Sequence, residues 1–167
     1  MKKKLIIILF LLLVIIIFYL NSSFHVLTIK KIPEEEIIFQ EKIFPGKQFI
    51  LIYTHSVAQT LVWEFFEIDN EGQLILNETH FYDHGAGLPY AAFGEEVFVS
   101  EDGKFKIKNM SRKIETPLYY RVYQDRDNIF IFENQKINLS ETIGNGLLTI
   151  DILHLKLIDY FLKKLRT

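Results

Sequence analysis

The chain of 167 residues contains no cysteine. A disulfide framework, a thiolate zinc site, an iron–sulfur cluster and a cysteine nucleophile are therefore all excluded. The sequence also lacks a basic excess. Of its 19 Lys and Arg, three are Lys2, Lys3 and Lys4, which leaves 16 against 21 Asp and Glu in the rest of the chain. Because nucleic-acid binding requires a basic face, this balance argues against a nucleic-acid partner.

Apolar residues, by contrast, are abundant. Hydrophobic residues make up 49% of the chain and aromatic residues 14%. This is enough apolar material for a packed core, so the chain is not a disordered one. The length favours a single folded domain.

The three lysines are followed by an uninterrupted apolar run, Leu5–Leu20. At about 1.5 Å per residue this run spans roughly 24 Å as a helix, and Phe24–Leu27 can extend it toward the ~30 Å of a hydrocarbon core. A cleaved signal peptide is the alternative, but the run is longer than a usual apolar region of such peptides and no A-x-A-like cleavage site follows it. We therefore predict that residues 1–23 form a membrane anchor.

The lysines also predict the orientation of the anchor. Lys2–Lys4 should stay in the cytoplasm, which places a domain of residues 24–167 outside it, in a single-pass arrangement at the cell membrane. The basic pair Lys30–Lys31 lies just beyond the span and is the one opposing feature. The absence of cysteine is compatible with an extracytoplasmic location, where stray thiols are a disadvantage.

Beyond the anchor, the apolar residues recur with a period near two, which indicates β-strands. Turn residues such as Pro45–Gly46, Asp69–Gly72 and Asp102–Gly103 separate the apolar segments. About nine short strands at this spacing predict a mainly β fold, an antiparallel β-sandwich or small barrel. The expected strands include Val26–Ile29, Ile37–Phe39, Gln48–His55, Leu61–Ile68, Gln73–Phe81, Lys104–Lys108, Pro117–Tyr123, Ile129–Phe132 and Leu147–Leu153.

Helical spacing occurs only at the C-terminus. Leu153, Leu157, Phe161 and Leu165 are four residues apart, which predicts a short amphipathic helix. Such a helix either closes one end of the sheet or contacts the outer leaflet of the membrane.

Two polar residues interrupt the apolar strands. His55 ends the most hydrophobic strand, and Glu64 lies between Trp63 and Phe65 in the next one. Because a buried carboxylate requires a partner, His55 is a candidate partner for Glu64, provided that the hairpin register places both on one face. Such a pair would either orient a ligand or hold a proton, or it would tie the end of the hairpin together.

Metal and nucleophile sites have weaker support. His80 and His84 have the i, i+4 spacing of a helical metal site, but they lie in a segment predicted as a strand, and no HExxH motif is present. Ser56 follows His55 directly, so the two side chains point to opposite faces of a strand. His25 and His154 are interpreted as incidental. No metal and no cofactor are expected.

A second motif, Gly85-Ala86-Gly87-Leu88-Pro89, predicts a constrained loop whose backbone N–H groups suit an anion, or else a simple sharp turn. Together with the sequence Tyr53–Val57 and with Glu64, this motif resembles the bacterial domain of unknown function eighteen-fifty. The positions that match are His55, Ser56, Val57, Glu64, Gly85, Ala86 and Gly87, with Pro89 closing the loop.

The resemblance implies small membrane-anchored proteins that are often encoded beside TRAP transporters of the TAXI type, and it implies no reaction. The leading hypothesis is therefore a non-enzymatic, membrane-tethered accessory or binding domain that assists such a transporter. The alternative is a small hydrolase or metal-dependent enzyme in which His55, Glu64 and His84 converge. A third hypothesis is a structural partner with an exposed apolar patch and no pocket.

Overall fold

The structure is a computed structural model that describes residues 2–83, 88–89 and 91–164. Over these residues the helices are α1 (Lys2–Leu20), α2 (Leu139–Ile143) and α3 (Leu157–Lys164). The strands are β1 (Ser23–Ile32), β2 (Glu36–Ile43), β3 (Gln48–Thr54), β4 (Leu61–Ile68), β5 (Leu74–Phe81), β6 (Val97–Glu101), β7 (Lys104–Lys108), β8 (Arg112–Ile114), β9 (Leu118–Val122), β10 (Asn128–Phe132), β11 (Gln135–Asn138) and β12 (Gly146–Lys156).

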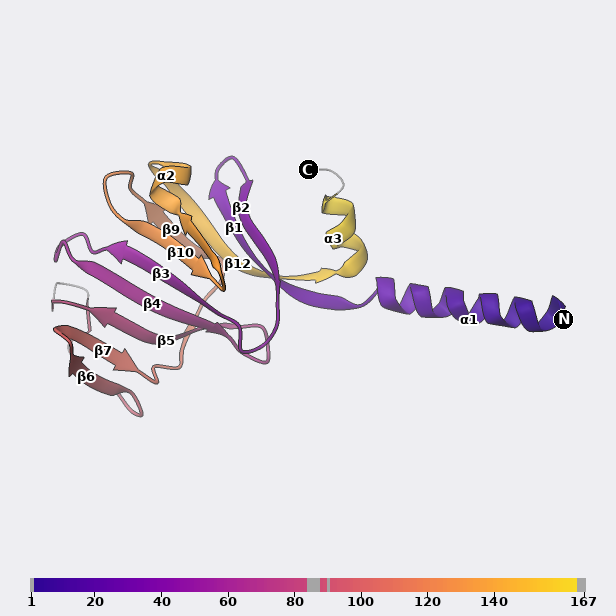
Figure 1. Cartoon of the computed structure of the whole chain (residues 1–167), viewed down its shortest axis with the longest axis horizontal. Coiled ribbons are helices and arrows are strands. Elements are labelled where there is room, and N and C mark those ends of the chain that lie inside the picture. The colour runs from indigo at the N-terminus through magenta and orange to yellow at the C-terminus, as the bar shows by residue number, and fades with distance from the viewer. Residues whose placement is uncertain (1, 84–87, 90, 165–167) are drawn as a thin grey trace.

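The strands form two antiparallel sheets, which together make up the head of the molecule (Figure 1). The small sheet has the order β2-β1-β12-β9. The large sheet has the order β11-β10-β3-β4-β5-β7-β6, and β8 pairs with β5. The prediction of a mainly β, antiparallel fold is confirmed, although β6, β8 and β11 were not predicted.

Strands are best predicted where alternation and turn residues agree. β7 has the bounds Lys104–Lys108 that the alternating sequence predicts, and it pairs with β6 across the turn Asp102–Gly103. Asp102 has φ 53° and Gly103 has φ 70°, the left-handed conformation that a two-residue hairpin turn requires.

The core lies between the two sheets. Phe39 of the small sheet contacts Phe130 of the large sheet with ring centroids 4.9 Å apart, and Phe49 stacks on Phe66 at the same distance. Leu27 and Leu51 are also fully buried in this cluster. The core contains no residue of α1 among those that the structure describes, so we expect the head to fold without that helix.

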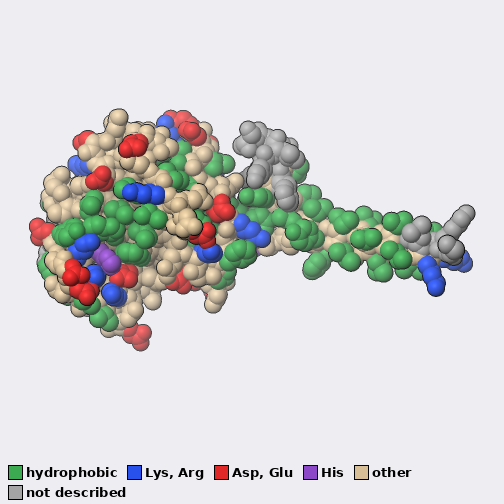
Figure 2. All heavy atoms as spheres, viewed as in Figure 1, with side chains coloured by type: hydrophobic (Ala, Val, Ile, Leu, Met, Phe, Trp, Pro, Cys, Tyr) green, Lys and Arg blue, Asp and Glu red, His purple; other side chains and the backbone are tan. Residues whose placement is uncertain are grey.

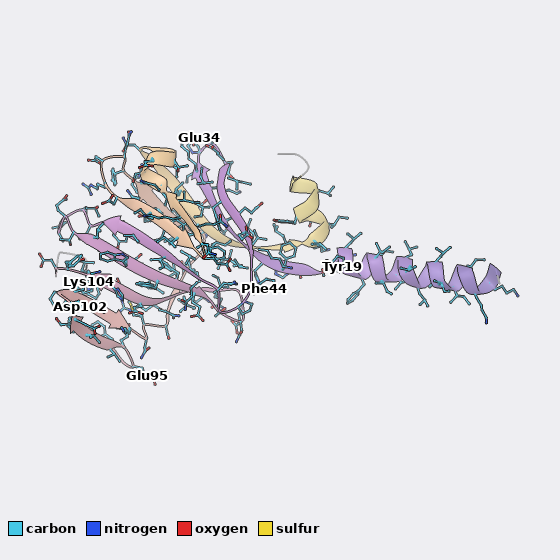
Figure 3. The ribbon with its side chains drawn as sticks, in the orientation of Figure 1. Tyr19, Glu34, Phe44, Glu95, Asp102 and Lys104 are labelled. Carbon is cyan, nitrogen blue, oxygen red and sulfur yellow. The ribbon has the colours of Figure 1, made fainter. Side chains whose placement is uncertain are left out.

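Helix α1 extends away from the head, and its surface in Figure 2 is hydrophobic along almost its whole length. Tyr19 lies at the end of α1 that meets the head (Figure 3). The large apolar side chains from Ile6 to Tyr19 are all exposed, with Val14 the least at 46%. Over the residues that the structure describes, no helix has both the length and the apolar character that a membrane crossing requires.

The C-terminal segment corrects one prediction. Leu153 belongs to β12, in agreement with the predicted strand Leu147–Leu153, and not to the helix, because β12 pairs with β1 as far as Lys156, which lies opposite Ser23. Leu165, the last residue of the predicted helix, lies outside the described residues. The helix begins only at Leu157. Tyr160 of α3 contacts the ring of Phe24 at 5.3 Å between centroids, so α3 lies against the start of β1.

Candidate functional site

The end of β3 leads into a tight turn that the imidazole of His55 stabilises. The backbone N–H of His55 donates to the carbonyl of Thr60 at 2.9 Å. Its ring nitrogen Nδ1 accepts from the backbone N–H groups of Val57 and Ala58 at 3.3 and 3.1 Å. One side of the ring therefore caps the turn through backbone N–H groups, and not through the pairing with Glu64 that the sequence suggested.

Glu64 lies on the inner face of β4, in the same row as the buried residues Val62 and Phe66. The register places Glu64 opposite Leu51, so Tyr53 is its diagonal neighbour on β3. The Tyr53 hydroxyl donates to Glu64 Oε1 at 3.2 Å. Between His55 and Glu64, both of which the structure describes, there is no hydrogen bond or ion pair. The partner of Glu64 is thus a tyrosine and not His55.

The environment of Glu64 opposes its ionisation. Burial raises the pKa of Glu64 above its ordinary value of 4.5, and the hydrogen bond from Tyr53 partly offsets this shift. Burial also raises the pKa of Tyr53 and that of Tyr120, and the nearby Glu64 adds to both shifts. The three side chains therefore form a polar group between the sheets in which the neutral forms are favoured.

A pocket of about 210 Å³ opens beside this group, where the end of β3 meets the edge strand β9 and the loop after it. We call it the arginine pocket. None of its lining residues is Asp or Glu. With the carboxylates that the structure describes, Arg121 and Arg126 form no ion pair, and the Arg126 guanidinium lies 5.1 Å from the ring centre of Tyr123. The lining consists of Tyr53, Thr54, His55, Ser56, Tyr119, Tyr120, Arg121, Tyr123, Arg126 and Asn128.

Asn128 holds one wall of this pocket in place. It is 4% exposed, and its Oδ1 accepts from the Tyr120 hydroxyl at 2.9 Å. Its Nδ2 lies 3.1 Å from the carbonyl oxygens of both Tyr123 and Arg126, and 3.0 Å from Ser140 Oγ. Because buried amides are costly to leave without partners, this network fixes the loop that carries Arg126.

The other predicted site residues that the structure describes lie in the turn after β3 and beside Leu88. Ser56 and Val57 are exposed in the turn after β3, and Val57 is 63% exposed. Pro89 is partly buried next to the buried Leu88. Gly85, Ala86, Gly87 and His84 lie outside the described residues.

The candidate metal ligand His80 gives metal-binding chemistry little support. His80 Nε2 lies 2.6 Å from Glu78 Oε1, so an acidic neighbour already occupies it. Across the part of the chain that the structure describes, no three His, Asp or Glu side chains cluster in a way that could hold a metal ion.

Sequence reasoning missed Arg121, Arg126 and Asn128. Asn128 could have been found, because it lies on the same face of β10 as the buried Phe130 and Phe132. An amide at an inward position of a strand requires polar partners. Arg126 reaches the pocket through the pairing of β10 with β3, and Arg121 belongs to β9 of the small sheet. The sequence offers no local pattern for either arrangement.

A second, larger cavity of about 440 Å³ lies along the outer face of the small sheet and includes Thr28, Lys30, Thr149 and Asp151. The positive charge of Lys30 is already paired, because Lys30 Nζ lies 2.9 Å from Glu35 Oε2. This cavity therefore offers a charged ligand less than the arginine pocket does, despite its greater volume.

Comparison with known proteins gives one match. The family model described as Domain of unknown function (DUF1850) matches residues 49–139, which is more than half of the chain. The match runs from β3 to the start of α2 and includes every residue of the arginine pocket as well as Glu64. No curated protein and no solved structure matches the chain significantly.

Proposed function

The chain belongs to the family of the Domain of unknown function (DUF1850), and we propose that it is a non-enzymatic, membrane-tethered binding domain outside the cytoplasm. Its site is the arginine pocket, and its ligand is a small organic anion. The observation that carries this proposal is the lining of the pocket, which combines two arginines with four tyrosines and contains no carboxylate. Arginine is the side chain best suited to carboxylates, because its planar fork binds both oxygens.

The neighbouring groups support an anionic ligand. A raised pKa keeps Glu64 closer to its neutral form, which reduces its repulsion of an anion. Tyrosine rings supply apolar contact for the body of an organic acid, and their hydroxyl groups supply hydrogen bonds. At about 210 Å³ the pocket is smaller than the 300–1,000 Å³ typical of drug-sized ligands, so the ligand is a small acid.

Calorimetric titration of the full chain in detergent micelles tests this proposal, with benzoate, acetate and inorganic phosphate as probes. Benzoate should bind more tightly than acetate, because only benzoate uses the tyrosine rings. Arg126→Gln should weaken benzoate binding about 10- to 100-fold, since a charge-assisted hydrogen bond contributes about 1.5–3 kcal/mol. Lys113→Gln, which removes an exposed positive charge from β8, is the matched control and should leave binding unchanged. Equal affinities of the wild type and Arg126→Gln would refute the proposal.

The tether is α1. The sequence and exposure of this helix support the anchor, because its large apolar side chains from Ile6 to Tyr19 are all exposed and no described residue of it joins the core. Its 19 residues correspond to about 28 Å at 1.5 Å per residue. A phosphatase reporter fused to the C-terminus, which is active only outside the cytoplasm, tests the orientation. Activity is expected, and an inactive phosphatase fusion would contradict the proposed topology.

A protein partner is the second part of the proposal, and the family resemblance suggests a component of a TAXI-type TRAP transporter. The outer face of the large sheet supports a partner, because its neighbouring strands carry adjoining apolar side chains where a solvated sheet face is usually polar. We call it the isoleucine face. Its residues are Ile50, Ile52, Trp63, Phe65, Ile129 and Ile131, all partly exposed.

Charge substitutions on this face test the partner. Ile52→Lys should abolish co-purification with the transporter's membrane subunits, whereas Ile37→Lys should not. Ile37 is the matched control because it is 41% exposed on β2 of the small sheet. In a deletion strain, import of the transporter's solute should fall. Import at the wild-type rate would count against this part of the proposal and leave anion binding standing.

A further inference from the structure

Two histidines from distant parts of the chain meet where α1 and α3 leave the head. His25 of β1 lies directly opposite His154 of β12 in the antiparallel register. His154 Nδ1 is 3.5 Å from His25 Nε2, and the ring centroids are 5.0 Å apart. The sequence predicts no role for either residue, and the structure brings them together.

A glycine of the large sheet holds one of the two rings. Gly72 lies in the turn between β4 and β5, with φ +77°. A Cβ at this position would be 2.3 Å from His25 Nε2, which is closer than any side chain allows. The turn therefore lies directly against the imidazole of His25 and restricts its rotation. His154 is exposed, so ions in solution have access to the pair.

The separation of the two nitrogens suits a shared metal ion better than a hydrogen bond. Hydrogen bonds from N–H groups have a most common length of about 2.9–3.0 Å, and 3.5 Å is longer than their usual range. Two imidazole nitrogens bound to one tetrahedral zinc ion, each at about 2.0–2.1 Å, are roughly 3.3–3.4 Å apart. A shift of one or two tenths of an ångström would thus bring both nitrogens into coordination distance.

We propose that His25 and His154 bind a divalent transition-metal ion, Zn²⁺ or Cu²⁺, through His25 Nε2 and His154 Nδ1. Imidazole nitrogen is a favoured ligand for both metals. Because no third ligand-type side chain clusters with the pair among the described residues, water completes the coordination and the ion exchanges with solution. The ion links the strand that follows α1 to the strand that precedes α3, so it stabilises the junction between the head and its tether.

The test is a calorimetric titration of the untagged full chain in detergent micelles with ZnCl₂. One ion per chain should bind. His154→Ala should weaken binding at least tenfold, and because His154 is exposed this variant should fold. His80→Gln is the matched control and should bind zinc like the wild type. Zinc binding that survives His154→Ala or disappears in His80→Gln would overturn the proposal.

Two further measurements separate the site from a general loss of structure. Gly72→Ala leaves both ligands in the chain but displaces the His25 ring, so it should also weaken zinc binding while circular dichroism stays that of the wild type. The electron paramagnetic resonance spectrum of the Cu²⁺-loaded chain should show two nitrogen ligands. A spectrum with one nitrogen ligand would contradict the bridging arrangement.

Discussion

The substitution Glu64→Gln should remove a contribution that lowers the stability of the head as the pH rises. Glutamine keeps an oxygen that accepts the hydrogen bond of the Tyr53 hydroxyl, which is 3.2 Å from Glu64 Oε1 in the wild type. It removes only the ability to ionise. Because burial raises the pKa of Glu64, the folded head binds the proton more tightly than the unfolded chain does.

The size and sign of the effect follow from this difference in proton binding. Stability that depends on a group with a raised pKa is fully present below the unfolded pKa and is lost as the pH rises through the folded pKa. The wild type should therefore lose up to about 1.4 kcal/mol per pH unit relative to Glu64→Gln, because one pKa unit corresponds to 1.36 kcal/mol. The loss should begin near pH 4.5, the ordinary pKa of the group, and should stop at its raised pKa.

Urea unfolding of the head without α1, measured from pH 4 to pH 9 for both proteins, provides the difference in free energy of unfolding. Subtracting one curve of unfolding free energy against pH from the other cancels the contributions of all other titrating groups. Tyr53→Phe is the companion variant. It removes the hydrogen bond that lowers the pKa of Glu64, so the loss of stability should continue to a higher pH before it stops. A difference that is flat, or that grows in favour of the wild type as the pH rises, would refute the burial argument.

Three further substitutions test the core, the pocket wall and a turn in the same unfolding assay. Phe130→Ala removes a ring that contacts Phe39 across the two sheets at 4.9 Å, and it should cost about 3–5 kcal/mol; a loss below 1 kcal/mol would argue against this core. Asn128→Ala leaves the Tyr120 hydroxyl without its acceptor and should cost about 1–3 kcal/mol while also weakening benzoate binding; unchanged binding would separate the network from the pocket. Gly103→Ala introduces a side chain at φ +70° and should cost about 1 kcal/mol; a gain in stability would contradict the positive φ.

The strands could be predicted where alternation and turn residues agree. β4 has the bounds Leu61–Ile68 that the sequence indicates, because a mostly apolar run of strand length is followed there by the turn residues Asp69–Gly72. The boundary between β12 and α3 could not be predicted in the same way. Leucines four residues apart lie on one face of a helix and also on one face of a strand, so Leu153 and Leu157 fit both. Pairing with β1, which is far away in the sequence, decides in favour of a strand up to Lys156.

The site shows the same limit. His55 and Glu64 stand out in the sequence because each interrupts an apolar strand, and both lie in or beside the pocket. Whether these two side chains can pair depends on the hairpin register, which the sequence leaves open. In the observed register, Glu64 accepts a hydrogen bond from Tyr53 instead. Arg126 lies in the loop between β9 and β10, and the pairing of β10 with β3, in which Asn128 lies opposite Tyr53, brings this loop to the end of β3.

Amide NMR spectra of the head, recorded during a titration with benzoate, test the central claim most directly. The account predicts that the resonances which move belong to the arginine pocket, above all those of His55, Tyr120 and Arg126. Shifts confined to the cavity of the small sheet around Lys30 and Asp151, or no shifts at all, would contradict it.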